Sequence, residues 1–345
     1  MNNFKYKNLT FLLLIKDRPQ FLKRWIKFHI HENDNINIFI ADGGKKSILN
    51  NDLKKINNKK NIRYHKYEYD KDYRSFIKKV LLSLRKIKTK YVLFCSDDDF
   101  LNFNAILKAK EILEQQTYIS AVTGKYISFQ GYNKFNRIFT HPSGLSFMYD
   151  KKCVFYKNRY KRIKNFFNKH PFGIFHYMMP TKMLRDAYQA VVNAKVYNAD
   201  LCDLFVNIYI YSKVKIIKRK DVFHMHQYHD NSEAHNRSYK VLLNKKYESE
   251  INEIAKIFSK KINIKTNKLR NDVLNFIKKG IKEKKGCMFI VKLKNIILNK
   301  YTFKFFEKYY FNKSIIEKDN FKKKLNKIDI DFIENVYSFF GLYIK

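Results

Sequence analysis

The sequence predicts an α/β protein whose central sheet is covered by helices on both faces. Apolar runs of strand length alternate with segments whose apolar residues recur at helical spacing. This alternation is typical of strand–helix–strand units around a parallel sheet. Acidic residues follow the ends of the first four expected strands, although the chain holds only 31 Asp and Glu against 71 Lys and Arg. We therefore expect a ligand site at the carboxyl edge of the sheet.

The first part of the chain supplies four strands and three helices. The strands are expected at residues 9–16, 37–41, 62–67 and 91–95. The helices are expected from Pro19 to about Phe28, over 72–87 and over 103–115. Pro19 suits a first helical turn, and Asp17 is placed to cap it.

The later part of the chain continues the alternation and then changes character. Strands are expected at 121–130, 172–179, 214–217 and 221–226, and helices at 181–193 and from about Asn198 to Tyr211. Beyond residue 240 the chain is rich in lysine and mostly helical, without an acidic cluster. We divide it into a ligand-binding half (1–120), a second half of the same domain (121–240) and a helical extension (241–345).

Three consecutive aspartates, Asp97, Asp98 and Asp99, directly follow the strand at 91–95. Their mutual repulsion is costly unless a cation offsets it, and hard oxygen ligands at a strand end suit Mg²⁺ or Mn²⁺. In an extended segment Asp97 and Asp99 would face one ion or one sugar, while Asp98 would point away or turn with the loop. The structural alternative is an acidic turn that caps the helix starting near Asn102.

Composition narrows the function classes. The formal net charge of +40 fits nucleic-acid binding or attraction to an anionic membrane. It also fits the codon bias of an AT-rich genome, and the scattered placement of the lysines favours this third explanation. The four cysteines lie far apart without CxxC spacing, which argues against a zinc site or a disulfide framework and fits a reducing cytoplasm. The apolar run 11–15 is too short to span a membrane and reads as a core strand.

The order of motifs resembles a known family. A strand is followed by Asp17-Arg18-Pro19 and a helix, the second strand ends in Ala41-Asp42-Gly43-Gly44, and the fourth ends in Ser96-Asp97-Asp98-Asp99-Phe100. Over residues 9–235 this resembles family 2-like bacterial glycosyltransferases of the GT-A fold, in particular a subgroup with a string of aspartates after the fourth strand. The resemblance implies a Rossmann-type mixed sheet flanked by helices, with a C-terminal helical extension.

The resemblance also implies site residues. It places a nucleotide-sugar, with a UDP-sugar as the expected donor, against Asp17, Arg18, Asp42, Asp72, Arg74 and Asp97. It assigns Mn²⁺ or Mg²⁺ to Asp98, Asp99 and His229, the last of a histidine cluster that includes His224 and His226. Two departures are visible: Ser96 stands where the subgroup often has another aspartate, and the Arg-Asn pairing after strand three is absent, which leaves Arg74 as the nearest basic residue.

The pair Asp200 and Asp203 falls where the family carries its catalytic carboxylate, at the start of a helix. An inverting transferase needs such a base to take the proton of the acceptor hydroxyl. We assign this role to Asp200 first and to Asp203 second. The structural alternative for Asp200 is a helix cap.

Three functions compete at this point. The first is a cytoplasmic glycosyltransferase that acts on a glycan or lipid-linked acceptor of the cell envelope, with peripheral contact to the inner face of an anionic membrane. The second, a sugar nucleotidyltransferase, predicts a glycine-rich phosphate loop after strand one, but Lys16-Asp17-Arg18-Pro19 contains no glycine. The third is a nucleic-acid binder using the aromatic and basic stretch 301–311. The same stretch also suits an interfacial helix on acidic lipid or a helix packed on the sheet domain, of which packing is the commoner role. We expect no nucleic-acid partner.

Overall fold

The computed structural model describes residues 7–31, 36–48, 61–116, 118, 120–132, 137–138, 146–147, 156–169, 177–228, 239–280 and 326–339. Its strands are β1 (Leu9–Ile15), β2 (Asn37–Asp42), β3 (Ile62–Lys66), β4 (Tyr91–Ser96), β5 (Asp99–Leu101), β6 (Ser120–Tyr132), β7 (Arg137–Ile138), β8 (Ser146–Phe147), β9 (Met178–Pro180) and β10 (Lys215–Tyr228). Its α-helices are α1 (Pro19–His31), α3 (Tyr73–Lys86), α4 (Phe103–Gln115), α5 (Arg159–Lys169), α6 (Thr181–Ala194), α7 (Ala199–Lys213), α8 (Glu248–Ile262) and α12 (Lys327–Phe339), with a further helical stretch over 266–280. Two short 3₁₀ helices, η4 (Tyr239–Leu243) and η5 (Lys245–Tyr247), precede α8.

The first four predicted strands are confirmed and run parallel. The register pairs Ile15 with Asp42 and Leu14 with Ser96, so β1, β2 and β4 end at one edge of the sheet. This shared edge brings together the acidic residues that follow each strand, as the sequence predicts.

The rest of the sheet is mixed. The strand order is β3-β2-β1-β4-β9-β6-β10-β5, and β9 runs antiparallel to both β4 and β6. The two strands expected at 214–217 and 221–226 are wrong as separate elements. They form the single strand β10, whose register with β6 shifts between Lys218 and His224. An irregularity of this kind interrupts the pairing without ending the strand.

Strand β5 was not foreseen, and it shows that the sheet curls. It begins at Asp99, with only two residues between it and the end of β4, yet it pairs antiparallel with β10 at the far end of the strand order. Strands separated by three others in the sheet can be joined by so short a turn only if the sheet bends back on itself. The turn contains Asp97 and Asp98.

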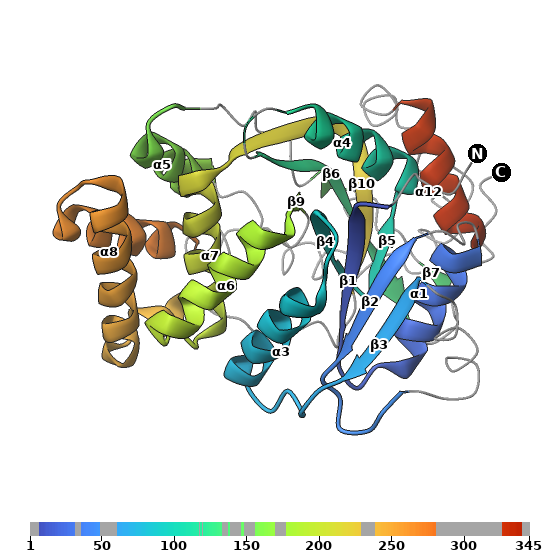
Figure 1. Cartoon of the computed structure of the whole chain (residues 1–345), viewed down its shortest axis with the longest axis horizontal. Coiled ribbons are helices and arrows are strands. Elements are labelled where there is room, and N and C mark those ends of the chain that lie inside the picture. The colour runs from blue at the N-terminus through green and yellow to red at the C-terminus, as the bar shows by residue number, and fades with distance from the viewer. Residues whose placement is uncertain are drawn as a thin grey trace, which may run out of the picture.

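Helices cover both faces of the sheet. In Figure 1, α3, α6 and α7 lie on one side of the central strands and α1 lies on the other. Alternate residues of β1 serve the two cores: Leu12 belongs to the cluster with α3, α6 and α7, whereas Leu13 belongs to the cluster with α1 and α4. Both leucines are fully buried, which explains the uninterrupted apolar run in the sequence.

The described parts of the C-terminal extension pack on the sheet domain rather than standing apart from it. Glu250 of α8 accepts hydrogen bonds from the backbone N–H groups of Tyr197 and Asn198, just before α7. Buried Asp329 of α12 accepts one from the backbone of Val222 in β10. The expected boundary near residue 240 is therefore crossed by polar contacts, although the division into units stays a prediction.

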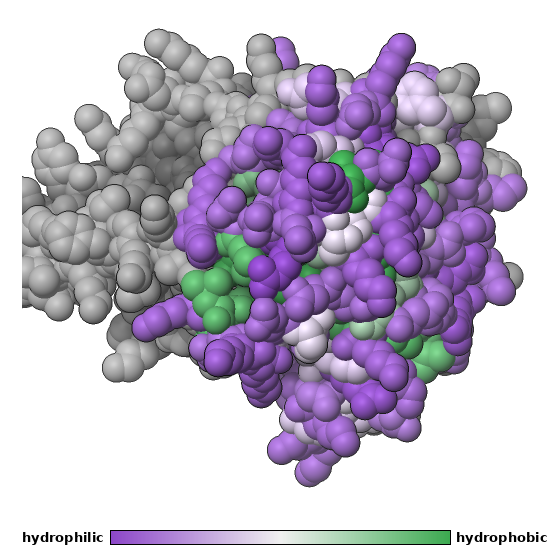
Figure 2. Space-filling view, turned by 90° about the vertical axis from the view of Figure 1, so that its left-hand side faces the viewer, coloured by the Kyte–Doolittle hydropathy of each residue, from purple (hydrophilic) through white to green (hydrophobic). Residues whose placement is uncertain are grey.

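The face of the molecule shown in Figure 2 is mostly hydrophilic, with small separate apolar patches. Within the described ranges, no helix combines the length and the apolar character that a bilayer crossing requires. The stretch 301–311, His229 and most of the strand expected at 172–179 lie outside the described residues.

Candidate donor and metal site

The aspartate triplet is buried at the point where the sheet curls. Asp97, Asp98 and Asp99 are each at most 3% exposed. Asp97 and Asp98 form the turn, and Asp99 opens β5. The turn brings a carboxylate oxygen of Asp98 and one of Asp99 within 4.8 Å of each other. The expectation that Asp97 and Asp99 face one ligand stays a prediction. The alternative in which Asp98 turns with the loop is the observed one, and Asn102 itself caps α4.

Arg18 binds the turn from the end of β1. Its guanidinium pairs with Asp97 through Nη2 and with Asp98 through Nη1, the latter at 3.3 Å. Burial works against the charged guanidinium, but the neighbouring carboxylates outweigh it and raise the pKa of Arg18. The side chain keeps 21% exposure, so part of the guanidinium side chain is open to solvent.

Asp98, Asp99 and His226 form a group with the spacing of a metal site. One ligand atom from each residue lies within 4.8 Å of the others. The Nδ1 atom of His226 lies 2.7 Å from Asp99 Oδ1 and 3.8 Å from Asp98 Oδ1. Two carboxylates and an imidazole suit Mn²⁺, and Mg²⁺ less well because it prefers oxygen. The sequence analysis assigns the histidine of this site to His229, which lies outside the described residues, so that assignment stays a prediction.

Burial and neighbouring charges shift the pKa values of His226 and of the adjacent Asp97. Burial disfavours charge on His226, but the hydrogen bond and charge of Asp99, helped by Asp98, raise the pKa of the imidazole. Burial is also the main reason that the pKa of Asp97 rises to about 7, with Arg18 opposing the rise and Asp98 adding to it. One oxygen of Asp97, Oδ2, is buried without a hydrogen-bond partner. Compact negative charge of this kind favours a bound cation.

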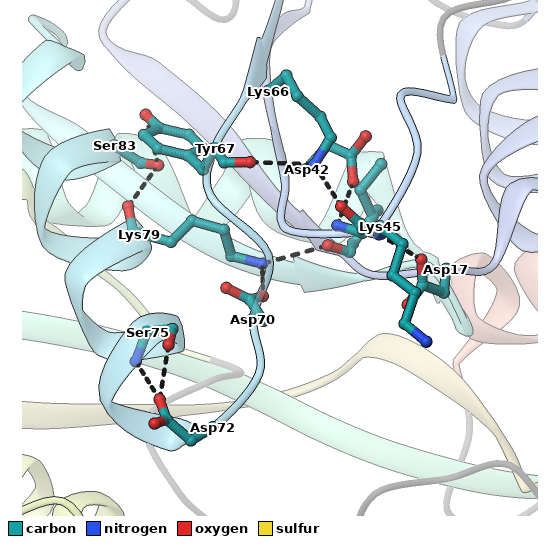
Figure 3. A network of polar contacts seen from close by, with 12 residues as sticks. Asp17, Asp42, Lys45, Lys66, Tyr67, Asp70, Asp72, Ser75, Lys79 and Ser83 are labelled. Atoms are coloured by element: carbon teal, nitrogen blue, oxygen red, sulfur yellow. Dashed lines mark hydrogen bonds and ion pairs between the residues drawn. The ribbon is translucent and has the colours of Figure 1, made fainter.

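A second polar network lies beside the first, at the ends of β1, β2 and β3 (Figure 3). Asp42 is fully buried and accepts hydrogen bonds from the N–H of Gly44 at 2.7 Å and from the hydroxyl of Tyr64. Asp17 adopts a left-handed backbone conformation (φ 52°) and accepts from the N–H of Lys45 at 2.6 Å. Its side chain therefore shapes the Gly43–Gly44 loop instead of capping α1 as expected.

Buried Asp70 and Lys79 join the three strand ends. The Lys79 ammonium donates to Asp70 Oδ2 and, at 3.2 Å, to the carbonyl of Ile15. Asp70 also packs against Gly43, where a Cβ atom would lie 2.1 Å from Oδ2, so glycine is required by close approach. Burial raises the pKa of Asp70 and lowers that of Lys79, against the pull of the ion pair.

The remaining predicted residues lie around the starts of α3 and α7. Asp72 is exposed and caps α3 through the N–H of Ser75, while exposed Arg74 lies over the Tyr197 ring, 4.9 Å from its centre. The Tyr73 hydroxyl donates to Asp203 at 2.8 Å. These contacts put both helix starts side by side at the carboxyl edge of the sheet.

Asp200 is partly buried in the first turn of α7. It is not the cap of that helix. The side chain of Asn198 accepts from the N–H groups of Asp200 and Leu201 and so fills the capping position. The cap is therefore not the reason for an aspartate at this position, although the helix dipole still favours one there.

Sequence reasoning missed several residues of this site. The sequence analysis assigns the metal to His229 rather than to His226, although the alternation of His226 with His224 places both on one face of a strand. Arg24 on α1 was not considered. The sequence does indicate a special role for Arg24, because it shares a helix face with Phe21, three residues before it, and Phe28, four residues after it. A charge on an otherwise buried face calls for a partner.

Comparison with known proteins supports the fold. The protein-family models give no match to this sequence, and no match is found among the curated proteins. Among solved structures, the S. aureus protein TarS (residues 1–349) in complex with UDP-GlcNAc aligns with a TM-score of 0.51 and 12% identity, over 98% of this chain and 84% of that chain. The same fragment with UDP aligns with a TM-score of 0.49 and 10% identity, over 97% of this chain and 89% of that one.

At such identities the likeness concerns the fold alone. This chain has a mixed, curled sheet flanked by helices, with further helices at its C-terminus, and in this fold it is like the UDP-GlcNAc complex of TarS. The predicted α/β class, with its C-terminal helical extension, is confirmed.

The buried ion pair gives a test of the network in Figure 3. Lys79→Met is expected to lower the free energy of unfolding by about 3–5 kcal/mol, because it leaves Asp70 buried and uncompensated. Lys78→Met is the matched control on the same helix, since the Lys78–Glu68 pair is exposed and is expected to contribute at most about 1 kcal/mol. Urea unfolding measures both, and equal losses in the two variants would contradict the assigned role of Lys79.

Proposed function

We propose that this protein is a glycosyltransferase that transfers a sugar from a nucleotide-sugar donor, with a divalent cation at Asp98, Asp99 and His226. The observation that carries the proposal is this Asp-Asp-His group beside Arg18, buried at the carboxyl edge of the sheet. The fold it occurs in is like that of TarS, a protein crystallised with the nucleotide-sugar UDP-GlcNAc. A UDP-sugar is accordingly the donor we propose.

The residues of the group fit the cation that the proposal needs. Their ligand atoms converge, their donors suit Mn²⁺, and the neighbouring oxygen Asp97 Oδ2 is buried without a hydrogen-bond partner. When bound, the ion supplies positive charge that stabilises a diphosphate leaving group. Arg18 adds a fixed positive charge from the protein, and its pairing with Asp97 holds the guanidinium in place.

The polar network at β1, β2 and β3 is proposed to shape the nucleoside pocket. Asp42 and Asp17 hold the Gly43–Gly44 loop, so their contribution to donor binding is through the backbone of that loop as much as through their own oxygens. Asp72 and Arg74 lie at the start of α3, beside this network, where both side chains are exposed to solvent. His229 stays a proposed contact.

The base that deprotonates the acceptor hydroxyl is proposed to be Asp200, with Asp203 as the second choice. Asp203 accepts a hydrogen bond from Tyr73, which occupies one of its oxygens. Asp200 lies at the positive end of α7, which favours its ionised form. The proposed acceptor is a glycan or lipid-linked unit of the cell envelope, handled in the cytoplasm at an anionic membrane surface to which the net charge of +40 is attracted.

The proposal predicts donor turnover that depends on the metal ligands. With Mn²⁺ and a panel of UDP-, GDP-, CMP- and dTDP-sugars, the protein should show a thermal shift with one class and slowly release the nucleoside diphosphate. Asp98→Asn and Asp99→Asn should each lower that release by about 100-fold or more, since each removes charge stabilisation from the leaving group.

The control for these variants is Asp186→Asn, at an exposed carboxylate paired with Lys182. It should leave release unchanged. Wild-type release in both triplet variants would remove the metal-site assignment. Formation of pyrophosphate from a nucleoside triphosphate and a sugar 1-phosphate would instead identify a nucleotidyltransferase.

The base assignment has its own test. Asp200→Asn should lower the rate of sugar transfer to an acceptor by about 10²–10⁴-fold, while the affinity for UDP stays at the wild-type level. Tyr73→Phe, which removes the hydrogen bond to Asp203, should have a much smaller effect. A large loss in Asp203→Asn together with normal transfer in Asp200→Asn would reverse the assignment.

A further inference from the structure

Arg24 and Gln227 connect helix α1 with the end of strand β10 beside the metal group. The Nη1 atom of Arg24 donates a hydrogen bond to Oε1 of Gln227, which is 203 positions away in the sequence. The backbone N–H of Gln227 donates to the carbonyl of Asp98 at 3.0 Å. Gln227 is buried, so its side chain and its backbone are both fixed. His226 is its immediate neighbour in the chain.

The positive charge of Arg24 interacts with the carboxylates of Asp97 and Asp98. Burial lowers the pKa of Arg24 to about 10, while Asp97 and Asp98 act in the opposite direction, so the guanidinium stays charged at neutral pH. Its hydrogen bond to Gln227 goes to a neutral amide and does not cancel this charge. The carboxylates thus gain a second nearby cation in addition to Arg18.

Two aromatic rings pack against the guanidinium of Arg24. The Cζ atom of Arg24 lies 4.6 Å from the ring centre of Phe21 and 5.3 Å from that of Phe100. Phe100 follows Asp99 directly in β5, and its ring also packs against Phe28 of α1, with 5.0 Å between ring centres. Arg24 is therefore seated between the helix and the strand that carries a metal ligand.

We infer that Arg24 and Gln227 are positioning residues that hold the end of β10 so that the imidazole of His226 faces Asp98 and Asp99. Neither residue is assigned to the ion or to the sugar. Their effect is on the geometry of the three ligands, in the way that neighbours of a metal ligand usually act. This inference rests on the proposed function, because it presumes a cation at the same group.

Direct measurement of Mn²⁺ binding tests the inference without relying on activity. Mn²⁺ is titrated into the protein in the presence of saturating UDP, and the Kd is obtained by calorimetry or from the electron paramagnetic resonance of free Mn²⁺. Gln227→Leu and Arg24→Met should each weaken Mn²⁺ binding by about 10–100-fold. The double variant should be no weaker than the worse single variant, because the two side chains act as one unit.

Two further variants separate positioning from general destabilisation. Gln227→Glu keeps the shape and an acceptor for Arg24 and should therefore bind Mn²⁺ clearly more tightly than Gln227→Leu. Lys23→Met removes the same formal charge from the exposed neighbouring position of α1 and should leave the Kd unchanged. Urea unfolding in the absence of metal verifies that each variant is folded at the temperature of the titration.

The outcomes distinguish this inference from the function beneath it. A wild-type Kd in both Gln227→Leu and Arg24→Met, with binding lost in Asp98→Asn, overturns the positioning role and leaves the metal site intact. A wild-type Kd in Asp98→Asn as well overturns the metal site and the proposed function together.

Discussion

The two-residue turn Asp97–Asp98 constrains the whole site. It joins β4 to β5, although three other strands lie between them in the sheet, and so it can exist only where the sheet has curled back. The same turn buries carboxylates that repel one another. Arg18 from the end of β1 ties the turn down through both aspartates, and β10 supplies His226 from the other side. The fold and the site therefore depend on each other. The curl of the sheet brings the aspartates together, and the positive charge of Arg18 stabilises the turn in which they lie.

Charge balance explains why basic residues gather here from distant parts of the chain. Arg18 and Arg24 come from the end of β1 and from α1, and Lys79 comes from α3. Arg18 and Lys79 pair with buried aspartates, which would otherwise be costly to ionise. With a net charge of +40, basic residues on the surface of this chain are expected from its composition alone. An arginine or lysine that pairs with a buried aspartate is not explained by composition and therefore indicates a particular structural role.

Local pattern was enough to predict the parallel half of the sheet, because β1, β2 and β4 are covered on both faces and read as apolar runs. It was also enough to place Asp98 and Asp99 at a strand end. It could not show that Asp98 and Asp99 converge, since the rotation within the turn depends on the pairing of β5 with β10, more than 120 residues away. For the same reason it could not choose His226 among its neighbours or recognise Gln227. Asp42 illustrates a different limit: its position was predicted, but its two oxygens are engaged by Gly44 and Tyr64.

The central claim is that the curl of the sheet builds a cation site from Asp98, Asp99 and His226. Crystals grown with Mn²⁺ and UDP, measured with X-rays near the manganese absorption edge, test it directly. The account predicts an anomalous difference peak within coordinating distance of all three side chains, with the diphosphate on its open side. A manganese peak bound elsewhere, with these three side chains still paired to one another, would contradict it.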